Sequence, residues 1–260
     1  MAVSRGMSVR AAALIVACTA VAVTGASTAA RAAEPACSAP AELTRFLKPL
    51  PRFAGRLAAG APLRIVALGS SSTVGLGASR PENAYPARLE ADLRRRFPAA
   101  AITVVNRGVN GNETRDEMLR FERDVLAEKP DLVIWQIGTN TLLNGHDMWS
   151  VFLDVRAGIR RLRAQGADVV LMNPQYSPRV LARADYEAMI DLVDVTGRET
   201  GVDVFDRFSV MRHWAQGLRY PFDVYITPDG LHMNDWGYAC LADRLADAIA
   251  RAPGVALAGP

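Results

Sequence analysis

Five short runs of apolar residues recur along the chain, and β-branched residues are frequent in them. The runs are Leu63–Leu68, Ile102–Val105, Leu132–Ile137, Val169–Met172 and Val202–Phe205. Each run is continuous rather than alternating, which is typical of parallel strands with both faces buried. We therefore expect a parallel sheet of five strands.

Between the predicted strands, apolar residues recur at helical spacing. The stripes consist of Tyr85, Leu89, Leu93 and Phe97; Met118, Phe121 and Val125; Phe152, Val155, Ile159 and Leu162; Tyr186, Met189, Ile190 and Val193; and Tyr238, Leu241, Leu245 and Ile249. This alternation of strand and helix predicts a three-layer α/β/α fold of the flavodoxin-like type. Right-handed crossovers place the loops after the strands at one edge of the sheet, where ligands bind in such folds.

The N-terminal segment has the pattern of a secretory signal peptide. Arg5 and Arg10 precede an apolar run over residues 11–23, and small residues follow this run. The tripeptide Ala30-Arg31-Ala32 fits an A-x-A cleavage site. We expect cleavage near Ala32 or Ala33 and export to the periplasm or the extracellular space.

Two alternatives for this segment stay open. A membrane anchor would need about 20 apolar residues, more than the run contains. Ile15–Cys18 resembles a lipobox, although the apolar run continues beyond Cys18. With the signal peptide removed, we expect no stable membrane span.

Composition and charge place the rest of the chain among ordinary globular proteins. Of 260 residues, 50% are hydrophobic and 22% are charged, which excludes a collagen, a coiled coil and a multi-span membrane protein. Without residues 1–33, the chain has 27 basic and 27 acidic residues. We expect no nucleic-acid partner, because no basic tract is present. Three segments follow: a signal peptide (1–33), a leader packed on the domain (34–62), with a short helical stretch near Glu42–Leu47, and the domain itself (63–260).

Cys37 and Cys240 are the cysteines that remain once Cys18 leaves with the signal peptide. An even number of cysteines in an oxidising compartment favours a disulfide. The alternative is two unrelated buried thiols, since the sequence does not give the distance between them.

Small and polar residues follow the predicted strands, at the edge where a ligand would bind. These segments are Gly69–Gly75, Asn106–Asn112, Gly138–Thr141 and, before the last helix, Pro228–His232. The first has no lysine of the Walker type, so it is better interpreted as a nucleophilic serine on a strand-to-helix turn. A serine needs a base. His232 follows Asp229 at a spacing that lets the carboxylate orient the imidazole.

The four segments resemble, in order, the motifs of the SGNH hydrolases, also called the GDSL esterase/lipase family, over Leu63–Ile249. The resemblance implies the SGNH hydrolase fold. It implies that Ser71 is the nucleophile, His232 the base and Asp229 the acid that orients the base. It also implies an oxyanion hole formed by the backbone N–H groups of Ser71 and Gly111 and the side-chain amide of Asn140.

Ser70 and Thr141 depart from this pattern, because each stands where the family usually has an acid. Neither is a triad position, so the departures bear on rate and substrate range more than on mechanism. Taken singly, the site residues also have structural interpretations. These are Ser71 as a turn residue, Gly111 as a residue of positive φ, Asn140 as a helix cap and Asp229 as a turn former. Their joint occurrence in order favours catalysis.

The sequence therefore predicts a secreted serine esterase, lipase-like, that hydrolyses carboxylic esters through an acyl-enzyme. A carbohydrate O-acetylesterase is an alternative of the same class. A weakly catalytic accessory protein that binds glycans or transfers O-acetyl groups is an alternative of another class. We expect a monomer that acts on a small-molecule, glycan or lipid ester. We expect neither a metal nor an organic cofactor, because no His/Cys cluster has ligand spacing.

Overall fold

The computed structural model describes residues 1–3, 6 and 35–255. Most of the predicted signal peptide, including the cleavage site at Ala30–Ala33 and Cys18, lies outside the described residues. The description that follows concerns residues 35–255.

A five-stranded parallel sheet forms the centre of the fold, and the strand order is β2-β1-β3-β4-β5. This is the flavodoxin-like order, with its switch point beside the first strand. The strands are β1 (Leu63–Gly69), β2 (Ile102–Gly108), β3 (Leu132–Gln136), β4 (Asp168–Met172) and β5 (Asp203–Phe205). The predicted fold class is confirmed, and each predicted run corresponds to one strand.

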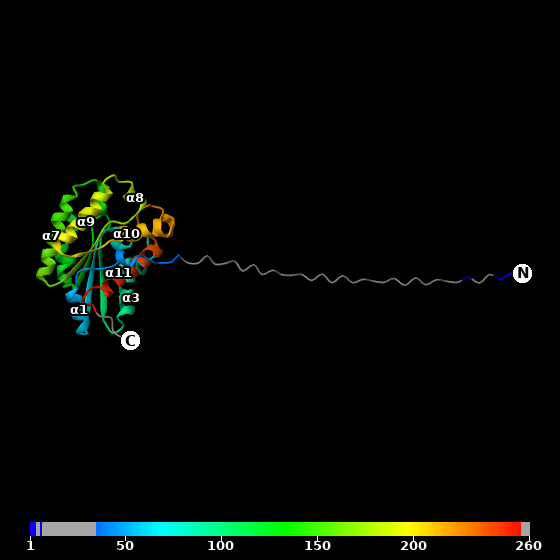
Figure 1. Ribbon diagram of the computed structural model, residues 1–260, viewed down its shortest axis with the longest axis horizontal. Coiled ribbons are helices and arrows are strands. Elements are labelled where there is room, and N and C mark those ends of the chain that lie inside the picture. The colour runs from blue at the N-terminus through cyan, green and yellow to red at the C-terminus, as the bar shows by residue number, and fades with distance from the viewer. Residues whose placement is uncertain (4–5, 7–34, 256–260) are drawn as a thin grey trace. The chain divides into compact units, whose positions relative to one another are not determined.

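Helices cover both faces of the sheet (Figure 1). The helices are α1 (Pro51–Ala58), α2 (Ser71–Val74), α3 (Tyr85–Arg96), α4 (Thr114–Leu119), α5 (Phe121–Asp124), α6 (Thr139–Asn144), α7 (Trp149–Ala164), α8 (Pro178–Leu181), α9 (Tyr186–Thr200), α10 (Arg207–Arg212) and α11 (Asp235–Ala250). Side chains of α1, α3 and α11 pack in one core cluster, and those of α5, α7 and α9 pack in the other. Successive residues of β1 alternate between the two: Ile65 belongs to the first cluster and Val66 to the second.

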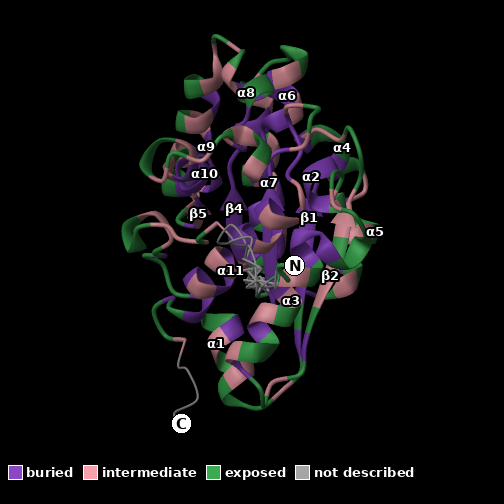
Figure 2. Cartoon of the chain, turned by 90° about the vertical axis from the view of Figure 1, so that its right-hand side faces the viewer, coloured by how far each residue is buried: buried purple, intermediate pink, exposed green. Residues whose placement is uncertain are grey.

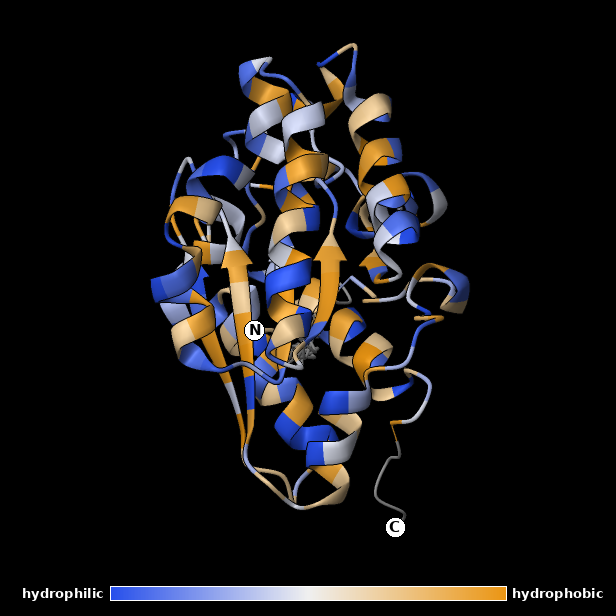
Figure 3. Cartoon of the chain, turned by 90° about the vertical axis from the view of Figure 1, so that its left-hand side faces the viewer, coloured by the Kyte–Doolittle hydropathy of each residue, from blue (hydrophilic) through white to orange (hydrophobic). Residues whose placement is uncertain are grey.

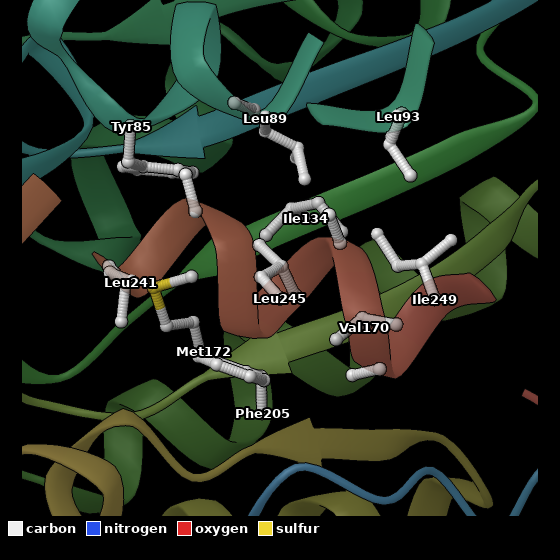
Figure 4. Packing of buried hydrophobic residues seen from close by; sticks show 14 of the residues in the cluster. Tyr85, Leu89, Leu93, Ile134, Val170, Met172, Phe205, Leu241, Leu245 and Ile249 are labelled. Carbon is white, nitrogen blue, oxygen red and sulfur yellow. The ribbon is translucent and has the colours of Figure 1, made fainter. Parts of the chain in front are cut away.

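The first core cluster is built around α11 (Figure 4). Leu241, Leu245 and Ile249 are each 0% exposed and share one face of this helix. Figure 4 shows them between side chains of α3, among them Leu89, and strand residues such as Val170. Burying an aliphatic side chain of this size contributes about 1.5–3 kcal/mol, so this face binds α11 firmly to the sheet.

The two ends of the sheet differ in what covers them. Figure 2 shows buried residues concentrated on the strands, with α1 at one end and α6 and α8 at the other. Figure 3 shows that the strands are also the most hydrophobic part, whereas the loops beyond them are mixed. Within the described part of the chain, none of the helices is long and apolar enough to cross a membrane.

Two helical predictions differ from the structure. The stripe of Met118, Phe121 and Val125 predicts one helix, but the structure breaks it into α4 and α5 at Arg120, which has φ −107° and ψ 5°. In the leader, the expected helix near Glu42–Leu47 is only a 3-10 turn at Ala41–Leu43. The longer helix α1 was not predicted, because Phe53 is the one residue that it buries and so no apolar stripe marks it.

The leader is held to the domain by hydrogen bonds, packing and a covalent bond. Cys37 and Cys240 form a disulfide, with their Cα atoms 5.4 Å apart. The Trp214 indole donates to the Ser38 carbonyl at 3.1 Å, and the Trp236 indole to the Pro35 carbonyl at 3.2 Å. The disulfide therefore joins the start of the described chain to α11.

Removing this disulfide should destabilise the protein. The bond closes a loop with a sequence separation of 203 residues, and a loop this long constrains the unfolded chain strongly, which predicts a loss of about 2–5 kcal/mol. Urea unfolding of a Cys37→Ala/Cys240→Ala variant would measure this loss. Wild-type protein treated with a reductant should unfold at the variant's midpoint, and equal midpoints for oxidised and variant protein would contradict the expectation.

Glu117 of α4 has a buried carboxyl group, and the residue is 1% exposed. It accepts a hydrogen bond of 2.6 Å from the Trp135 indole of β3. Burial raises the pKa of Glu117 from 4.5 to about 8, against the opposing effects of the Trp135 hydrogen bond and of Arg120. The folded state therefore keeps this proton over a pH range in which the unfolded chain loses it.

This proton makes stability depend on pH. Because the folded pKa of Glu117 is the higher one, its contribution is lost as the pH rises from 4.5 to about 8. Glu117→Gln keeps an acceptor for Trp135 and removes the titration. We expect the free energy of unfolding of the variant to exceed that of wild type, with a difference that grows as the pH rises and reaches a few kcal/mol near pH 8. Denaturant unfolding from pH 5 to 8 tests this, with Glu122→Gln on exposed surface as the control; parallel curves for Glu117→Gln and wild type would refute it.

Candidate active site

The turn from β1 into α2 presents Ser71 at the carboxyl end of the sheet. Ser71 is the first residue of α2 and is 7% exposed. Gly69 ends the strand, where a Cβ atom would lie 2.3 Å from Thr73 Oγ1 and 2.7 Å from Gln136 Oε1. Only glycine fits there without displacing both side chains, so this residue permits the close approach of Thr73 and Gln136 to the turn that carries Ser71.

A hydrogen-bonded chain joins the three residues that the resemblance singles out as a triad. His232 Nε2 lies 2.8 Å from Ser71 Oγ, and His232 Nδ1 lies 2.5 Å from Asp229 Oδ2. His232 is 6% exposed. Both ring nitrogens therefore have a partner, which holds the imidazole in an orientation that lets Nε2 accept a proton from Ser71.

Asp229 is strongly favoured as a carboxylate. Burial opposes its ionisation, but hydrogen bonds from the His232 ring and from the backbone N–H groups of His232 and Leu231 outweigh that effect. The pKa of Asp229 therefore lies well below its ordinary value. Asp229 Oδ1 accepts from His232 N at 2.9 Å, from Leu231 N at 2.8 Å and from the Thr227 hydroxyl at 2.8 Å. Its negative charge holds the Nδ1 proton of His232 and would stabilise an imidazolium.

Gly111 and Asn140 lie on loops that leave the strands flanking β1. Gly69 of β1 pairs with Gly108 of β2, so the loops that follow these two strands start side by side. Gly111 has φ +78°, and the space where a Cβ would lie is open. Asn140, in the first turn of α6 after β3, donates from Nδ2 to the Asn112 carbonyl at 2.8 Å. The side-chain amide of Asn140 therefore lies next to the Gly111 segment.

Arg120 ties the Gly111 loop to β1. Its guanidinium donates to the Gly69 carbonyl at 3.1 Å, the Arg107 carbonyl at 2.9 Å and Asn112 Oδ1 at 2.8 Å. Asp124 accepts from the same group at 3.0 Å. The break between α4 and α5 thus falls at the residue whose side chain fixes the loop beside Ser71.

Ser70 and Thr141, the two departures from the SGNH pattern, each belong to a hydrogen-bond network. Gln136 Oε1 accepts from the Ser70 backbone N–H at 3.0 Å, the Ser70 hydroxyl at 3.0 Å and the Thr73 hydroxyl at 3.2 Å. A carboxylate at position 70 could only accept hydrogen bonds, so it would oppose this oxygen where Ser70 donates to it. The Thr141 hydroxyl donates to Glu113 at 3.1 Å, which means that a carboxylate is supplied from the neighbouring loop.

The other two histidines form no hydrogen bond with Ser71 or Asp229 among residues 35–255. His146 Nδ1 is 2.8 Å from Glu113 Oε1 on an exposed loop, and His213 begins a short π-helix after α10.

Several polar residues around the site were missed by sequence reasoning. Gln136, Gln175 and Arg207 are 2%, 1% and 0% exposed and lie at or just beyond the carboxyl ends of β3, β4 and β5. The signal was available, since polar residues directly after an apolar run mark this edge of a parallel sheet. Gln175 and Arg207 follow the fourth and fifth strands in the same way as the candidate residues follow the first three.

One protein-family model matches nearly all of the described chain. The profile of the Non-GDSL lipase-like family matches residues 36–254. The chain belongs to the Non-GDSL lipase-like family. Its sequence Gly69-Ser70-Ser71-Ser72 accords with that description, since serine stands where a GDSL motif has aspartate.

Known relatives of this family member include esterases. The chain is similar to an acetylxylan esterase from Geobacillus stearothermophilus, with 31% identity over 136 residues. The match covers 45% of this chain and 62% of that protein, so the chain spans about three fifths of the relative's length. Among solved structures, a variant of an acetyl-xylooligosaccharide esterase from the same organism has a TM-score of 0.62 at 24% identity, covering 72% of this chain and 94% of the other. A two-domain esterase active on acetylated mannans has a TM-score of 0.66 at 23% identity, covering 83% and 57%. At these identities the structures support the shared fold.

Two glycines of the site should respond differently to alanine. In Gly108→Ala the new Cβ would lie 2.3 Å from Val74 N and 2.7 Å from Thr73 C, and backbone atoms cannot move away cheaply. We expect a loss of about 3 kcal/mol in the free energy of unfolding. In Gly111→Ala the new Cβ lies in open space, so only the strain of the positive φ lowers the free energy of unfolding, by about 1–2 kcal/mol. Urea unfolding of both variants tests the order, and a Gly108→Ala protein as stable as Gly111→Ala would disprove it.

Proposed function

We propose that this protein is an exported serine esterase that removes acetyl groups from carbohydrate. The observation that carries the proposal is the hydrogen-bonded chain from Asp229 through His232 to Ser71, with 2.8 Å between Nε2 and Oγ. Nucleophile, base and orienting acid at these distances are the arrangement that activates a serine. The same series of hydrogen bonds supports assigning the protein to the SGNH hydrolases within the broader group of esterases.

The reaction proceeds through an acyl-enzyme. His232 Nε2 takes the proton of Ser71 as Oγ forms a bond to the ester carbonyl carbon. The tetrahedral intermediate collapses, the ester C–O bond breaks, and His232 gives its proton to the departing sugar hydroxyl. Water then attacks the acetyl-serine with His232 again as base, which releases acetate and restores Ser71. Asp229 holds the imidazole and balances its transient positive charge throughout.

Three donors are proposed for the oxyanion: the backbone N–H groups of Ser71 and Gly111 and the Asn140 amide. As the first residue of α2, Ser71 has an N–H that no helical carbonyl can accept. Asn140 and the Gly111 loop are tied together through the Asn112 carbonyl, so these donors are preorganised. Loss of one such donor typically costs about 3–4 kcal/mol of transition-state stabilisation.

The named relatives favour an acetylated carbohydrate over a lipid ester as substrate. An acetylxylan esterase is similar in sequence, and esterases active on acetylated xylooligosaccharides and mannans share the fold. This supports the carbohydrate O-acetylesterase, the sequence-based alternative, over a general carboxylesterase or lipase.

Export is part of the proposal. The signal-like segment, residues 1–33, would leave a mature chain that starts with the leader (34–62) and continues into the domain (63–260). The disulfide of Cys37 and Cys240 agrees with export, since disulfides persist in oxidising compartments.

The nucleophile can be tested by comparing three adjacent serines. Ser71→Ala should lose at least three orders of magnitude in kcat and all labelling by a fluorophosphonate. Ser70→Ala and Ser72→Ala keep the nucleophile and lose one neutral hydrogen bond, worth about 1 kcal/mol, so we expect at most about tenfold lower rates. Peptide mapping should locate the adduct on Ser71. An adduct on Ser70 or Ser72, with Ser71→Ala still active, would overturn the assignment.

The substrate class needs its own assay. Purified protein should release acetate from acetylated xylan or mannan and from short p-nitrophenyl esters, but not fatty acid from a lysophospholipid. Faster release from the lysophospholipid would replace the carbohydrate assignment with a lipid one. An unlabelled, inactive protein that still binds the polysaccharide would indicate an accessory binding protein.

A further inference from the structure

Arg207 is a buried cation behind the candidate active site. It follows β5 as the first residue of α10 and is 0% exposed. Its Nε donates to the Asn173 carbonyl at 3.0 Å, and its Nη2 donates to Gln175 Oε1 at 2.9 Å. Within residues 35–255, no carboxylate forms an ion pair with it, and Nη1 has no hydrogen-bond partner. Since burying an unpaired charge costs several kcal/mol, its retention calls for a role beyond packing.

The neighbours of the guanidinium leave it charged. Tyr85 of α3 and Tyr238 of α11 face it, and burial raises the pKa of Tyr85 to about 12. Burial lowers the pKa of Arg207 only to about 10, so it keeps its proton at neutral pH. The adjacent Asp206 uses Oδ1 to accept from Asn173 Nδ2 and from the Ser209 backbone.

Arg207 determines which way the Gln175 side chain is oriented. A guanidinium can only donate hydrogen bonds, so it requires the amide oxygen of Gln175 to face it. The Thr139 hydroxyl donates to the same oxygen at 3.1 Å. The amide nitrogen is thereby directed to the other side, where it donates to the Leu231 carbonyl at 3.2 Å and to Ser72 Oγ at 3.4 Å.

These two acceptors are the chain neighbours of the reacting pair. Leu231 precedes His232, and Ser72 follows Ser71. We propose that Gln175, oriented by Arg207, is a positioning residue that fixes the separation of Ser71 and His232 by bridging the two loops that carry them. This inference rests on the proposed function, since it assigns a role within that same site. An error of about 1 Å in such a separation can cost about a hundredfold in rate.

Gln175→Glu is the sharpest test, because it preserves shape and changes one group. The carboxylate can still accept from Arg207 and Thr139, but it cannot donate to Leu231 or Ser72. We expect fluorophosphonate labelling of Ser71 to slow about 10- to 100-fold and the NMR signals of the His232 ring protons to shift, because the ring would no longer lie at the same distance from Ser71.

Asn83→Asp is the matched control. Asn83 is also a buried amide that accepts from an arginine, Arg88, and donates to other groups, Ser79 and Asp235. Asn83 makes no hydrogen bond to Ser72 or Leu231; its partner Asp235 lies three residues after His232, at the start of α11. The same amide-to-acid change there should lower thermal stability without slowing the labelling of folded protein as Gln175→Glu does.

Arg207→Lys provides a second test if Gln175→Glu does not fold. Lysine keeps the positive charge but lacks the planar fork, so labelling should slow and the NMR signals of the His232 ring protons should shift with no change of charge. Labelling at the wild-type rate in each folded variant, or unshifted His232 signals in Arg207→Lys, would overturn the inference. Wild-type protein that resists labelling refutes the esterase proposal instead, and the His232 signals of the folded variants then decide the role of Gln175.

Discussion

One hydrogen bond, from Ser71 to His232, joins residues that are 161 positions apart in the chain. The rest of the fold can be understood as the means of bringing these two side chains together. Ser71 directly follows the turn at the end of β1, a strand paired on both sides. His232 is fixed by α11, whose inner face packs against the same sheet (Figure 4). Neither element could shift without moving the other.

Most of the polar residues around this bond are neutral. Amide and hydroxyl groups of Gln136, Gln175, Ser70 and Thr139 lie behind the serine. Arg207 is the buried charged group bonded to them, and the acids Asp229 and Glu113 lie at the edges of this region. A buried neutral polar group needs only hydrogen-bond partners, whereas a buried carboxylate also needs a group of opposite charge or several hydrogen-bond donors. This explains how the site remains ordered without the acids that the GDSL pattern has at positions 70 and 141.

The fold could be predicted from the sequence because its signals are local. The run Leu132–Ile137 is apolar on both faces apart from Gln136, and the stripe of Leu241, Leu245 and Ile249 repeats at helical spacing, so the burial of each segment can be inferred from its own residues. The break at Arg120 could not be predicted, because its guanidinium bonds to the carbonyl of Gly69, far away in the chain. The same holds for Gln175, whose role depends on Arg207 and Leu231 coming from other elements. Of the candidate site, the pairing of Asp229 with His232 could be predicted because the two residues are close in sequence, whereas Gln175 and Arg207 are brought beside them only by the tertiary structure.

The disulfide also determines how the domain carries mechanical load. Cys37 lies two residues after the start of the described leader, and its partner Cys240 lies in α11. A force pulling on the chain at Pro35 is therefore passed through a covalent bond into a helix packed over the sheet. The hydrogen bond from Trp214 to Ser38, which lies beyond Cys37, does not have to bear it. Attachment of the protein to a solid support or a larger particle through its N-terminal side would leave the leader in place, so the domain can be tethered there without being unravelled from that end.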